Sequence, residues 1–280
     1  MQPKIIDGSA YAKLVQADLV TRVQHIVATS GVTPRLATII VGDNPASVTY
    51  VNMKHNSCLR VGIEPMKIEL PESTTTDELL AAIDKLNRDD TVFGILLQHP
   101  CPKHLDELRC FDAIALEKDV DGVTTVGFGA MTMGKQAFYP ATPYAILSLL
   151  RHYDIPIEGK NAVVIGRSQI LGKPVAMMLL NANATVTICH TKTQNLPDIV
   201  RSADIVVAAV GRAHFVQPDW IKPGAVLMDA GYNEGHVGDI DPAAFEKSSA
   251  YTPVPGGIGP VTRIKLIEQT VEAAERKLLK

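Results

Sequence analysis

The sequence predicts two α/β domains, each built on a mostly parallel β-sheet. A chain of 280 residues is too long for one average hydrophobic core and suits two domains. Short apolar runs alternate with segments of helical periodicity, first in the N-terminal part and again from residue 161 onward. Strands that are separated by helices pair in parallel. The periodicity fades over residues 127–140, so we expect the domain junction there.

The first domain is expected to begin with an amphipathic helix that ends near Gly31, because Leu19, Val23 and Ile26 recur at helical spacing. The elements that follow are a strand at 36–41, a helix at 46–60, a strand at 66–70, a helix at 77–87 and a strand at 92–97. Thr75 and Glu78 have the spacing of a capping box at the start of the second of these helices.

The second domain is expected to repeat this alternation. Its elements are a strand at 161–165, a helix at 171–182, a strand at 185–189, a helix at 196–202 and strands at 204–209 and 225–229. Thr142 is expected to cap the preceding helix, with Pro143 at its first position. We therefore place the domains at 1–140 and 141–262, with a last amphipathic helix over 263–280 that could pack back on the first domain.

Composition and charge exclude several classes of function. The net charge of −3 and the pI of about 6.2 leave no basic surface for nucleic acid or an anionic membrane. No apolar run approaches the roughly 18 residues of a membrane span, and the N-terminus lacks a signal-peptide pattern. The cysteines, Cys58, Cys101, Cys110 and Cys189, form no CxxC pair, and the histidines have no ligand spacing. We therefore expect a cytoplasmic protein with neither a metal nor disulfides.

Residues 161–172 predict a nucleotide-binding turn. They form a strand that runs into Gly166 and then a helix that Gly172 would allow to pack close to the strand. The amides and the positive dipole at the start of such a helix favour a pyrophosphate. Because Arg167 and Ser168 interrupt the Gly-x-Gly-x-x-Gly pattern, a plain strand–turn–helix is the alternative. As a nucleotide site, this domain would be a Rossmann-like, doubly wound parallel sheet.

The next strand favours NADP over NAD. It ends in His190-Thr191-Lys192, where an NAD site usually has an Asp or Glu for the ribose hydroxyls. Arg167, Ser168 and the residues after this strand could instead surround a 2′-phosphate. A lone Lys after a strand is, however, more often only solvated.

Tyr50 and Lys54 are the candidates for chemistry in the first domain. They lie four residues apart on one expected helix, so the phenol and the ammonium point the same way. A desolvated Lys loses proton affinity and could act as a general acid and base near neutral pH. Gln98 follows an apolar strand, and Asp121 lies in a loop where it could bind the donor edge of an aminopyrimidine. A solvated surface helix and ordinary strand-end or turn residues are the alternatives.

Segment 253–260, Pro-Val-Pro-Gly-Gly-Ile-Gly-Pro, is too rich in Pro and Gly for a helix or a central strand. It could present backbone amides to a ligand, or it could be a rigid connector before the last helix.

Several of these segments together resemble one known family. In chain order they are Val41–Lys54 (VGDNPASVTYVNMK), Gly94–Gln98 (GILLQ), Lys118–Gly122 (KDVDG), Gly166–Ser168 (GRS) and Pro253–Pro260. They are similar to the motifs of the bifunctional methylenetetrahydrofolate dehydrogenase/methenyltetrahydrofolate cyclohydrolase family, over nearly the whole chain. Each motif alone is weak, and their shared order makes the resemblance specific.

The resemblance implies an N-terminal folate-binding catalytic domain and an NADP-binding domain. 5,10-Methylenetetrahydrofolate would be oxidised with NADP and the methenyl product hydrolysed to 10-formyltetrahydrofolate, in one-carbon metabolism and purine biosynthesis. Lys54 would be the main catalytic group, and Tyr50 would orient the folate. Gln98 would tune Lys54, and Asp121 would hold the pterin ring. The implied NADP contacts are Gly166, Arg167, Ser168, Thr191 and Tyr232, and the further substrate contacts are Pro255, Gly256 and Gly259. The resemblance also implies a homodimer paired through the nucleotide domains.

The chain departs from the family pattern in three places. Val123-Thr124 stand where Phe-His is common, His99-Pro100-Cys101 where Pro-Leu-Pro is usual, and Ala141-Thr142-Pro143 where Cys-Thr-Pro occurs. The four catalytic or folate-positioning residues are retained, so the resemblance still implies both activities. The loop changes leave the relative rates of the two reactions and the fit of the pterin open.

Other functions fit parts of the pattern. One is a folate enzyme that acts only as a dehydrogenase, with weak cyclohydrolase activity. Another is a non-folate, NADP-dependent two-domain dehydrogenase of the shikimate type, which would give Tyr50, Lys54 and Gln98 no shared role. A non-enzymatic NADP-binding regulator would need no placed Lys. A short-chain dehydrogenase does not fit, because its nucleotide turn precedes the Tyr.

Overall fold

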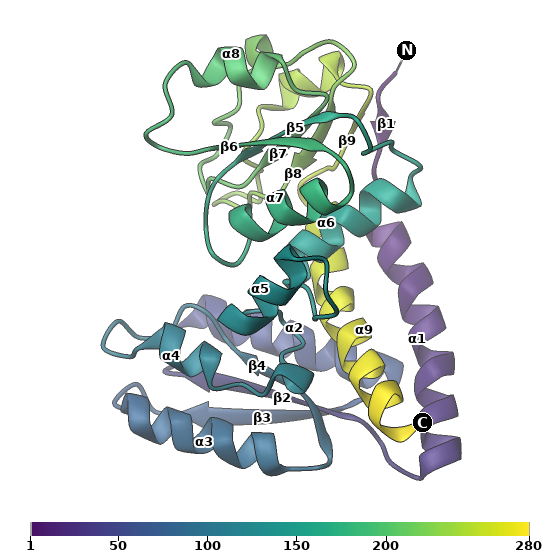
Figure 1. Ribbon diagram of the computed structural model, residues 1–280, viewed down its shortest axis with the longest axis vertical. Helices are drawn as coiled ribbons and strands as arrows, with labels where there is room; N and C mark the ends of the chain where they lie inside the picture. The colour runs from purple at the N-terminus through teal and green to yellow at the C-terminus, as the bar shows by residue number, and fades with distance from the viewer. Residues whose placement is uncertain (1, 280) are drawn as a thin grey trace. The chain divides into compact units, whose positions relative to one another are not determined.

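The computed structural model describes residues 2–279, apart from the side chain of Ala46, and divides them into two compact units (Figure 1). The three-stranded unit contains residues 13–141 and 263–279, and the six-stranded unit contains residues 2–12 and 142–262. Both sheets are parallel throughout their described strands, so the predicted α/β class is confirmed.

The sheet of the three-stranded unit has helices on both faces. Its strands are β2 (Arg35–Val41), β3 (Glu64–Leu70) and β4 (Val92–Leu97), in the order β3-β2-β4. Its helices α2 (Pro45–Val61) and α3 (Thr76–Arg88) lie on opposite faces, and α4 (Glu107–Asp112) shares the apolar cluster of α3 (Figure 1). Every residue of β4 is buried, which explains its unbroken apolar sequence. The predicted capping box of Thr75 and Glu78 is present.

The last helix, α9 (Ile258–Leu278), packs within the three-stranded unit from residue 263 onward. Gln269 Nε2 donates to Val120 O at 2.7 Å, and Gln269 Oε1 accepts from Tyr139 N at 2.7 Å. Arg22 of α1 (Gly8–Ser30) forms a bidentate ion pair with Glu275, at 2.7 and 2.9 Å. These contacts fasten the C-terminal helix to the N-terminal part of the chain.

In the six-stranded unit the strand order is β1-β9-β8-β7-β5-β6. The strands are β1 (Lys4–Ile5), β5 (Asn161–Ile165), β6 (Thr185–Cys189), β7 (Ile205–Ala208), β8 (Val226–Asp229) and β9 (Ala250–Tyr251). The helices are α6 (Ala141–His152), α7 (Gly172–Asn181) and α8 (Leu196–Arg201). The direction of winding reverses at β5, so the carboxyl ends of β5 and β7 flank the position where such sheets bind ligands.

The N-terminal segment corrects the expected division of the chain. Lys4 N donates to Ser249 O and Ile6 N donates to Tyr251 O, both at 2.8 Å. These hydrogen bonds add β1 to the six-stranded sheet, whereas the expected domain 1–140 placed this segment with the other unit. A strand of two residues has too little pattern to be predicted from sequence.

One helix was not expected, and two expectations about helices were wrong. The region expected as a junction contains α5 (Thr125–Thr132), where Thr124 accepts from Gly127 N at 3.0 Å as the N-cap. Helix α6 begins before Thr142, so that residue lies in its first turn and does not cap it. Helix α9 begins inside the Pro/Gly-rich segment, with Pro260 in the first turn, where its missing N–H has no intrahelical partner to lose.

The short 3-10 helices, η1 (Leu116–Lys118), η2 (Pro218–Trp220) and η3 (Pro242–Lys247), complete the described elements. None of the helices within residues 2–279 combines the length and apolarity that crossing a bilayer requires.

Gly94 in β4 lies in a closely packed place between the sheet and α9. A Cβ there would lie 2.7 Å from Val120 Cγ2 and 2.9 Å from both Leu36 Cδ1 and Thr270 Oγ1. We expect Gly94→Ala to lower the free energy of unfolding by about 1–3 kcal/mol, because all three neighbours must shift. Urea denaturation of the variant measures this.

Gly129→Ala is the matched control, because no atom lies within 4 Å of the added Cβ in α5. It should leave the free energy of unfolding unchanged or raise it by about 0.5–1 kcal/mol. Equal stability of the two variants would contradict the packing described for Gly94.

Candidate active site

Lys54 and Gln98 meet in the three-stranded unit. Lys54 lies in the second half of α2, and Gln98 follows β4, where its backbone N–H donates to Ile39 O at 2.8 Å. Lys54 Nζ donates to Gln98 Oε1 at 3.0 Å, and Gln98 Nε2 donates to His99 O at 2.7 Å. The second hydrogen bond fixes the carboxamide so that its oxygen faces the ammonium.

Burial shifts the pKa values of Lys54 and Asp121 toward each other. The pKa of Lys54 is lowered because its ammonium loses hydration, and the nearby carboxylate of Asp121 offsets this only partly. The pKa of Asp121 is raised by burial, against the opposing charges of Lys54 and His99. Both groups move toward their neutral forms, which suits proton transfer near neutral pH. The structure thus brings Lys54, Gln98 and Asp121 together.

Tyr50 lies one helical turn before Lys54 on α2 and leaves 41% of its surface exposed. The four-residue spacing places the ring on the same helix face as Lys54. The phenol ring therefore offers a flat surface beside the amine, on which a planar ligand could stack.

Two charged neighbours hold the loop that carries Asp121. Lys118 Nζ donates to three backbone carbonyls at the C-terminal end of α3, at 2.7–2.9 Å, where helical partners are missing. The buried carboxylate of Asp119 accepts from the N–H groups of Val123 and Thr124 at 2.9 and 3.0 Å. Burial raises the pKa of Asp119 to about 6. Within this charged segment, Lys118 and Asp119 are therefore structural.

Glu107 holds the loop that follows Gln98. Its Oε1 lies 2.9 Å from His99 Nδ1 and accepts from Cys101 N at 2.7 Å. Burial raises the pKa of the Cys101 thiol to about 12, which keeps the thiol protonated and unreactive. Although His99-Pro100-Cys101 departs from the family pattern, the contacts of Glu107 hold this loop in place, so Gln98 keeps a defined position.

The six-stranded unit has a tight glycine turn after its central strand β5. Gly166 has a φ of +132°, and a Cβ there would lie 2.3 Å from Ala209 O. Gly172 opens α7, and a Cβ there would lie 2.3 Å from Gly166 O. Leu171, the N-cap residue, makes no side-chain hydrogen bond to the helix. The turn therefore leaves room for a phosphate close to the backbone at the positive end of α7, although the amides of Gly172 and Lys173 already donate to Ser168.

Exposed side chains follow β5 and β6. Arg167, Ser168 and Thr191 are all exposed, and Ser168 Oγ accepts from Gly172 N at 3.2 Å. No acidic residue lies between His190 and Lys192, where it would repel an added phosphate. This set of donors fits the 2′-phosphate of NADP better than the free hydroxyl of NAD.

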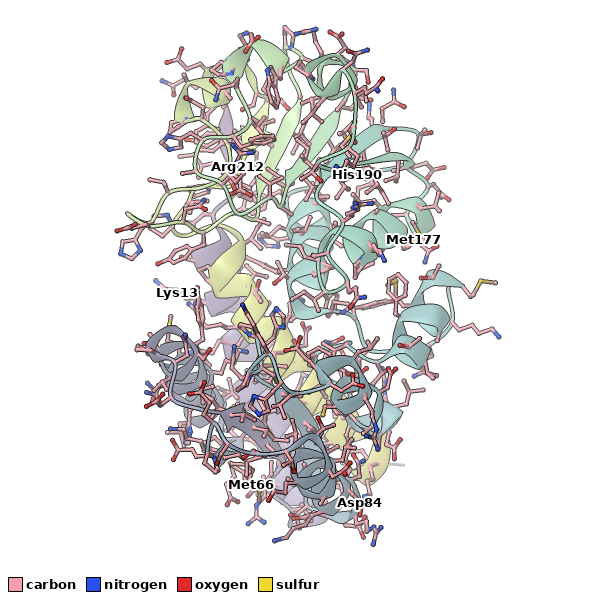
Figure 2. The ribbon with its side chains drawn as sticks, turned by 90° about the vertical axis from the view of Figure 1, so that its left-hand side faces the viewer. Lys13, Met66, Asp84, Met177, His190 and Arg212 are labelled. Atoms are coloured by element: carbon pink, nitrogen blue, oxygen red, sulfur yellow. The ribbon has the colours of Figure 1, made fainter. Side chains whose placement is uncertain are left out.

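The loops after the neighbouring strands reach the same edge of the sheet. Figure 2 labels His190 and Arg212, which lie just beyond β6 and β7. Tyr232, after β8, is 54% exposed, and its hydroxyl contacts His236 Nδ1.

The other predicted substrate contacts lie in the six-stranded unit, whereas Lys54 lies in the three-stranded unit. Gly256 O accepts from Ser9 N at 2.9 Å, and Gly256 has a φ of +104°. Pro255 precedes it and is exposed, and Gly259 is in the first turn of α9.

Asp229 and Asp239 are the buried acids that sequence reasoning missed as a pair. Asp239 is 0% exposed and accepts hydrogen bonds from the loop after β7. Burial raises the pKa of Asp229 to about 6. No local pattern marks these roles, because the backbone amides that donate to Asp239 lie more than 25 residues away along the chain.

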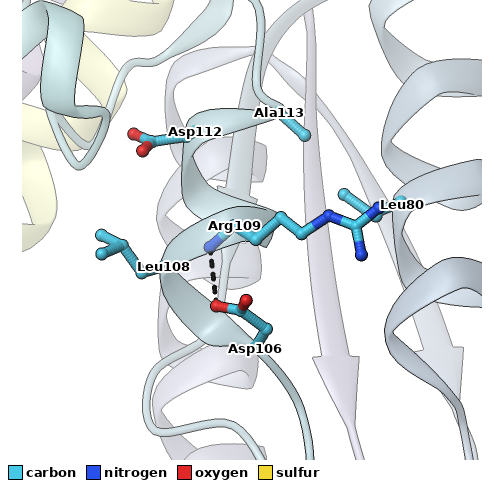
Figure 3. Close-up of a pocket in the computed structure, with 6 residues that line it drawn as sticks. All are labelled: Leu80, Asp106, Leu108, Arg109, Asp112 and Ala113. Atoms are coloured by element: carbon cyan, nitrogen blue, oxygen red, sulfur yellow. Dashed lines mark hydrogen bonds between the residues drawn. The ribbon is translucent and has the colours of Figure 1, made fainter.

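Surface hollows do not identify the site by themselves. One, of about 640 Å³, is lined by Leu80, Asp106, Leu108, Arg109, Asp112 and Ala113 and holds none of the predicted residues (Figure 3). Another, of about 550 Å³, includes Asp43, Glu72 and the segment 100–104, next to Gln98. Among the described residues, no cluster of three or more His, Cys, Asp or Glu side chains is placed to hold a metal ion.

Comparison with known proteins matches both units. Residues 6–121 match the catalytic domain of the tetrahydrofolate dehydrogenase/cyclohydrolase family, and residues 140–278 match its NAD(P)-binding domain. The bifunctional protein FolD of Acidobacterium capsulatum is 60% identical over 278 residues, which are 99% of each chain.

Solved structures agree. The bifunctional FolD dehydrogenase/cyclohydrolase of Campylobacter jejuni is 42% identical with a TM-score of 0.96, covering 98% of this chain and 99% of that one. The Trypanosoma brucei enzyme, complexed with NADP cofactor and inhibitor, is 35% identical with a TM-score of 0.95 over all of both chains. The chain therefore belongs to the tetrahydrofolate dehydrogenase/cyclohydrolase family, with the catalytic domain followed by the NAD(P)-binding domain.

Proposed function

We propose that Lys54 serves both reactions of this bifunctional enzyme. The enzyme oxidises 5,10-methylenetetrahydrofolate with NADP and hydrolyses the methenyl product to 10-formyltetrahydrofolate. The observation that carries the assignment is the hydrogen bond of a dehydrated ammonium to Gln98, next to the carboxylate of Asp121. The family, the matched domains and the NADP-bound relative support the reaction and the cofactor.

Asp121 and Tyr50 position the pterin. The aminopyrimidine edge of a pterin presents adjacent N–H donors, which a carboxylate accepts as a pair. The exposed ring of Tyr50 stacks on the planar system, and the helix spacing sets it beside Lys54.

In the oxidation, a hydride leaves the methylene carbon and a methenyl cation remains on the folate. NADP supplies the nicotinamide that accepts the hydride. A lowered pKa reduces the positive charge on Lys54, so the residue opposes the developing cation less than a fully charged ammonium would. Gln98 Oε1 provides a neutral acceptor, which keeps Lys54 in place without restoring its proton affinity as a carboxylate would.

In the hydrolysis, water adds to the methenyl carbon. The neutral amine of Lys54 takes a proton from this water as the carbon–oxygen bond forms. The resulting ammonium then gives a proton to N5 as the carbon–N5 bond breaks. The added hydroxyl loses its own proton as its oxygen becomes the carbonyl of the formyl group on N10, and this is the one proton released overall.

The residues of the six-stranded unit hold the nucleotide. The pyrophosphate lies beside Gly166 and the positive end of the α7 dipole, and Arg167, Ser168 and Thr191 bind the 2′-phosphate. Tyr232 lines the same edge. Pro255, Gly256 and Gly259 add substrate contacts.

The enzyme is a cytoplasmic homodimer that serves one-carbon metabolism and purine biosynthesis. The edge strand β6 supports pairing through the six-stranded unit, because its only strand neighbour in the described sheet is β5. Val186 and Ile188 on it are only partly buried, which leaves some apolar surface for a second copy to cover.

Lys54→Ala tests the assignment. With 5,10-methylenetetrahydrofolate and NADP, the unchanged enzyme should form NADPH without accumulating methenyltetrahydrofolate. The variant should lose about 10²–10⁴-fold in hydrolysis, because the general base is gone, while its affinity for NADP stays the same. Absorbance of methenyltetrahydrofolate and NADPH, followed together, measures both steps.

Arg60→Ala, at the exposed end of the same helix, is the control and should keep both activities. Full hydrolysis by Lys54→Ala would contradict the role of Lys54. Absence of cofactor reduction by the unchanged enzyme would contradict the folate function itself.

Gln98→Glu should move the pH dependence of hydrolysis upward. A carboxylate beside Lys54 Nζ favours the ammonium and raises the pKa of Lys54, so the neutral amine appears only at higher pH. The acid limb of the kcat profile should therefore shift to higher pH, and the rate at pH 7 should fall. Gln98→Leu, which removes the acceptor, should shift that limb the other way. Shifts of the same sign in both variants would exclude the proposed coupling.

Arg167→Ala should separate the two nucleotides. Loss of a charge-assisted contact to the 2′-phosphate should raise the Kd for NADP about 10- to 100-fold and leave the Kd for NAD within about twofold. Isothermal titration with each nucleotide measures this, with Arg201→Ala on α8 as the control. Equal weakening of both nucleotides would place Arg167 at the shared pyrophosphate instead.

A further inference from the structure

The carboxylate of Asp239 collects the backbone amides of the loop after β7. Asp239 is 0% exposed, and its Oδ2 accepts from Val210 N at 2.6 Å and from Gly211 N at 2.9 Å. Its Oδ1 accepts from Arg212 N at 2.9 Å and from Asn233 Nδ2 at 3.0 Å. Three consecutive amides thus converge on one buried negative charge, an arrangement that proteins elsewhere use to bind anions.

Asp229, at the end of β8, holds Asp239 in turn. Asp229 is 2% exposed and accepts from the N–H groups of Asp239, Ile240 and Gly231, each at 2.9 Å. Gly231 leaves room for the pair, because a Cβ there would lie 2.2 Å from Asp239 Oδ1. A Cβ on Gly238 would lie 2.0 Å from Asp229 Oδ2. Both carboxylates therefore fill spaces that only glycine leaves open.

The loop held by Asp239 forms a wall of the glycine turn. Ala209, directly before the loop, donates its N–H to Ile165 O at 2.8 Å and extends the pairing of β7 with β5. Its carbonyl oxygen lies 2.3 Å from the position of a Cβ on Gly166. A shift of the loop would therefore change the space beside Gly166, where the pyrophosphate is proposed to bind.

We propose that Asp239 is a positioning residue of the nucleotide site, which acts as an internal anion on the amides of residues 210–212 and holds this loop against Gly166. Because the backbone amides of residues 210–212 already donate to Asp239, this loop offers the nucleotide its carbonyl groups and side chains but no backbone N–H donor. The proposal rests on the proposed function only for the identity of the nucleotide, NADP.

Asp239→Asn tests this with little change of shape. The Asn amide nitrogen replaces one oxygen, so in either orientation an N–H donor faces backbone or side-chain donors and the loop is pushed away. Isothermal titration should show that the Kd for NADP rises about tenfold or more. The KM for NADP should rise likewise, with a smaller effect on kcat. Hydrolysis of methenyltetrahydrofolate without nucleotide should stay within about twofold, because Lys54, Gln98 and Asp121 lie in the other unit.

Asp241→Asn is the matched control. Asp241 lies two residues further on and accepts from Ala243 N at 2.9 Å as an N-cap, which Asn also serves. This variant should bind NADP as the unchanged enzyme does. If Asp239→Asn keeps its affinity for NADP, or if both variants lose affinity equally, the proposal is overturned.

Asn233→Ala decides the case if Asp239→Asn does not fold. It removes the hydrogen bonds of Asn233 Nδ2 to Asp239 Oδ1 and, at 3.3 Å, to Val237 O, while the backbone N–H of Asn233 still donates to Val237 O. The Kd for NADP should rise about two- to fivefold with an unchanged Tm, and an unchanged Kd would overturn the proposal. NADP binding is measured without folate. A failure of the unchanged enzyme to act on folate would therefore count against the proposed function and not against the role of Asp239.

Discussion

The hydrogen bond from Lys54 Nζ to Gln98 Oε1 joins a helix to the end of a strand, and the proposed chemistry depends on it. An ammonium that loses hydration needs an acceptor, or its burial costs more than the fold can offset. A carboxylate in direct contact would supply the acceptor and fix the proton on Lys54. The neutral carboxamide of Gln98 supplies it without that effect, and Asp121 contributes only at a distance. The parallel sheet makes the meeting possible, because its carboxyl edge carries the ends of β2 and β4 together.

Buried carboxylates that accept backbone amides hold three loops of the structure. Asp119 holds the loop of Asp121, and Asp229 and Asp239 hold the loops after β7 and β8. The backbone N–H groups of each loop lack the hydrogen-bond partners that a helix or a strand would supply. One carboxylate accepts charge-assisted hydrogen bonds from two or three of them and so fixes the loop. The raised pKa of Asp119 and Asp229, about 6 in each, shows that dehydration outweighs these bonds.

The raised pKa values of Asp119 and Asp229 make the stability of the fold depend on pH. A carboxyl group whose folded pKa exceeds its unfolded value contributes most to stability at low pH, and the contribution is lost as the pH rises toward about 6. At neutral pH both carboxylates therefore cost folding free energy. An apolar side chain in either place would leave two or three backbone amides without an acceptor, so the charges are consistent with a need for fixed loop geometry.

Sequence predicted most where a pattern is local. The strands at 161–165 and 185–189 match their predicted bounds, because each is one apolar or alternating run that ends in a turn. The capping box of Thr75 and Glu78 was likewise predictable, because it depends on only four consecutive residues. Helix α5 escaped prediction because its Gly and Met residues have weak periodicity, and its signal is the cap at Thr124. The role of Asp239 escaped because a carboxylate among distant amides is defined by tertiary contacts alone.

The departures from the family pattern show why the predicted cluster survives changes in the residues beside it. Glu107 ties the ring of His99 and the backbone of Cys101 to one carboxylate, so the loop after Gln98 is fixed from outside the reacting groups. The side chain of Thr124 accepts a hydrogen bond from Gly127 N at the start of α5, and its backbone N–H donates to the carboxylate of Asp119. The altered positions therefore act on the supports of Gln98 and Asp121, and the groups proposed to touch the folate keep their mutual geometry. In the proposed mechanism only hydrolysis requires Lys54 to accept and return a proton, so substitutions at such supports would alter the rates of oxidation and hydrolysis relative to each other.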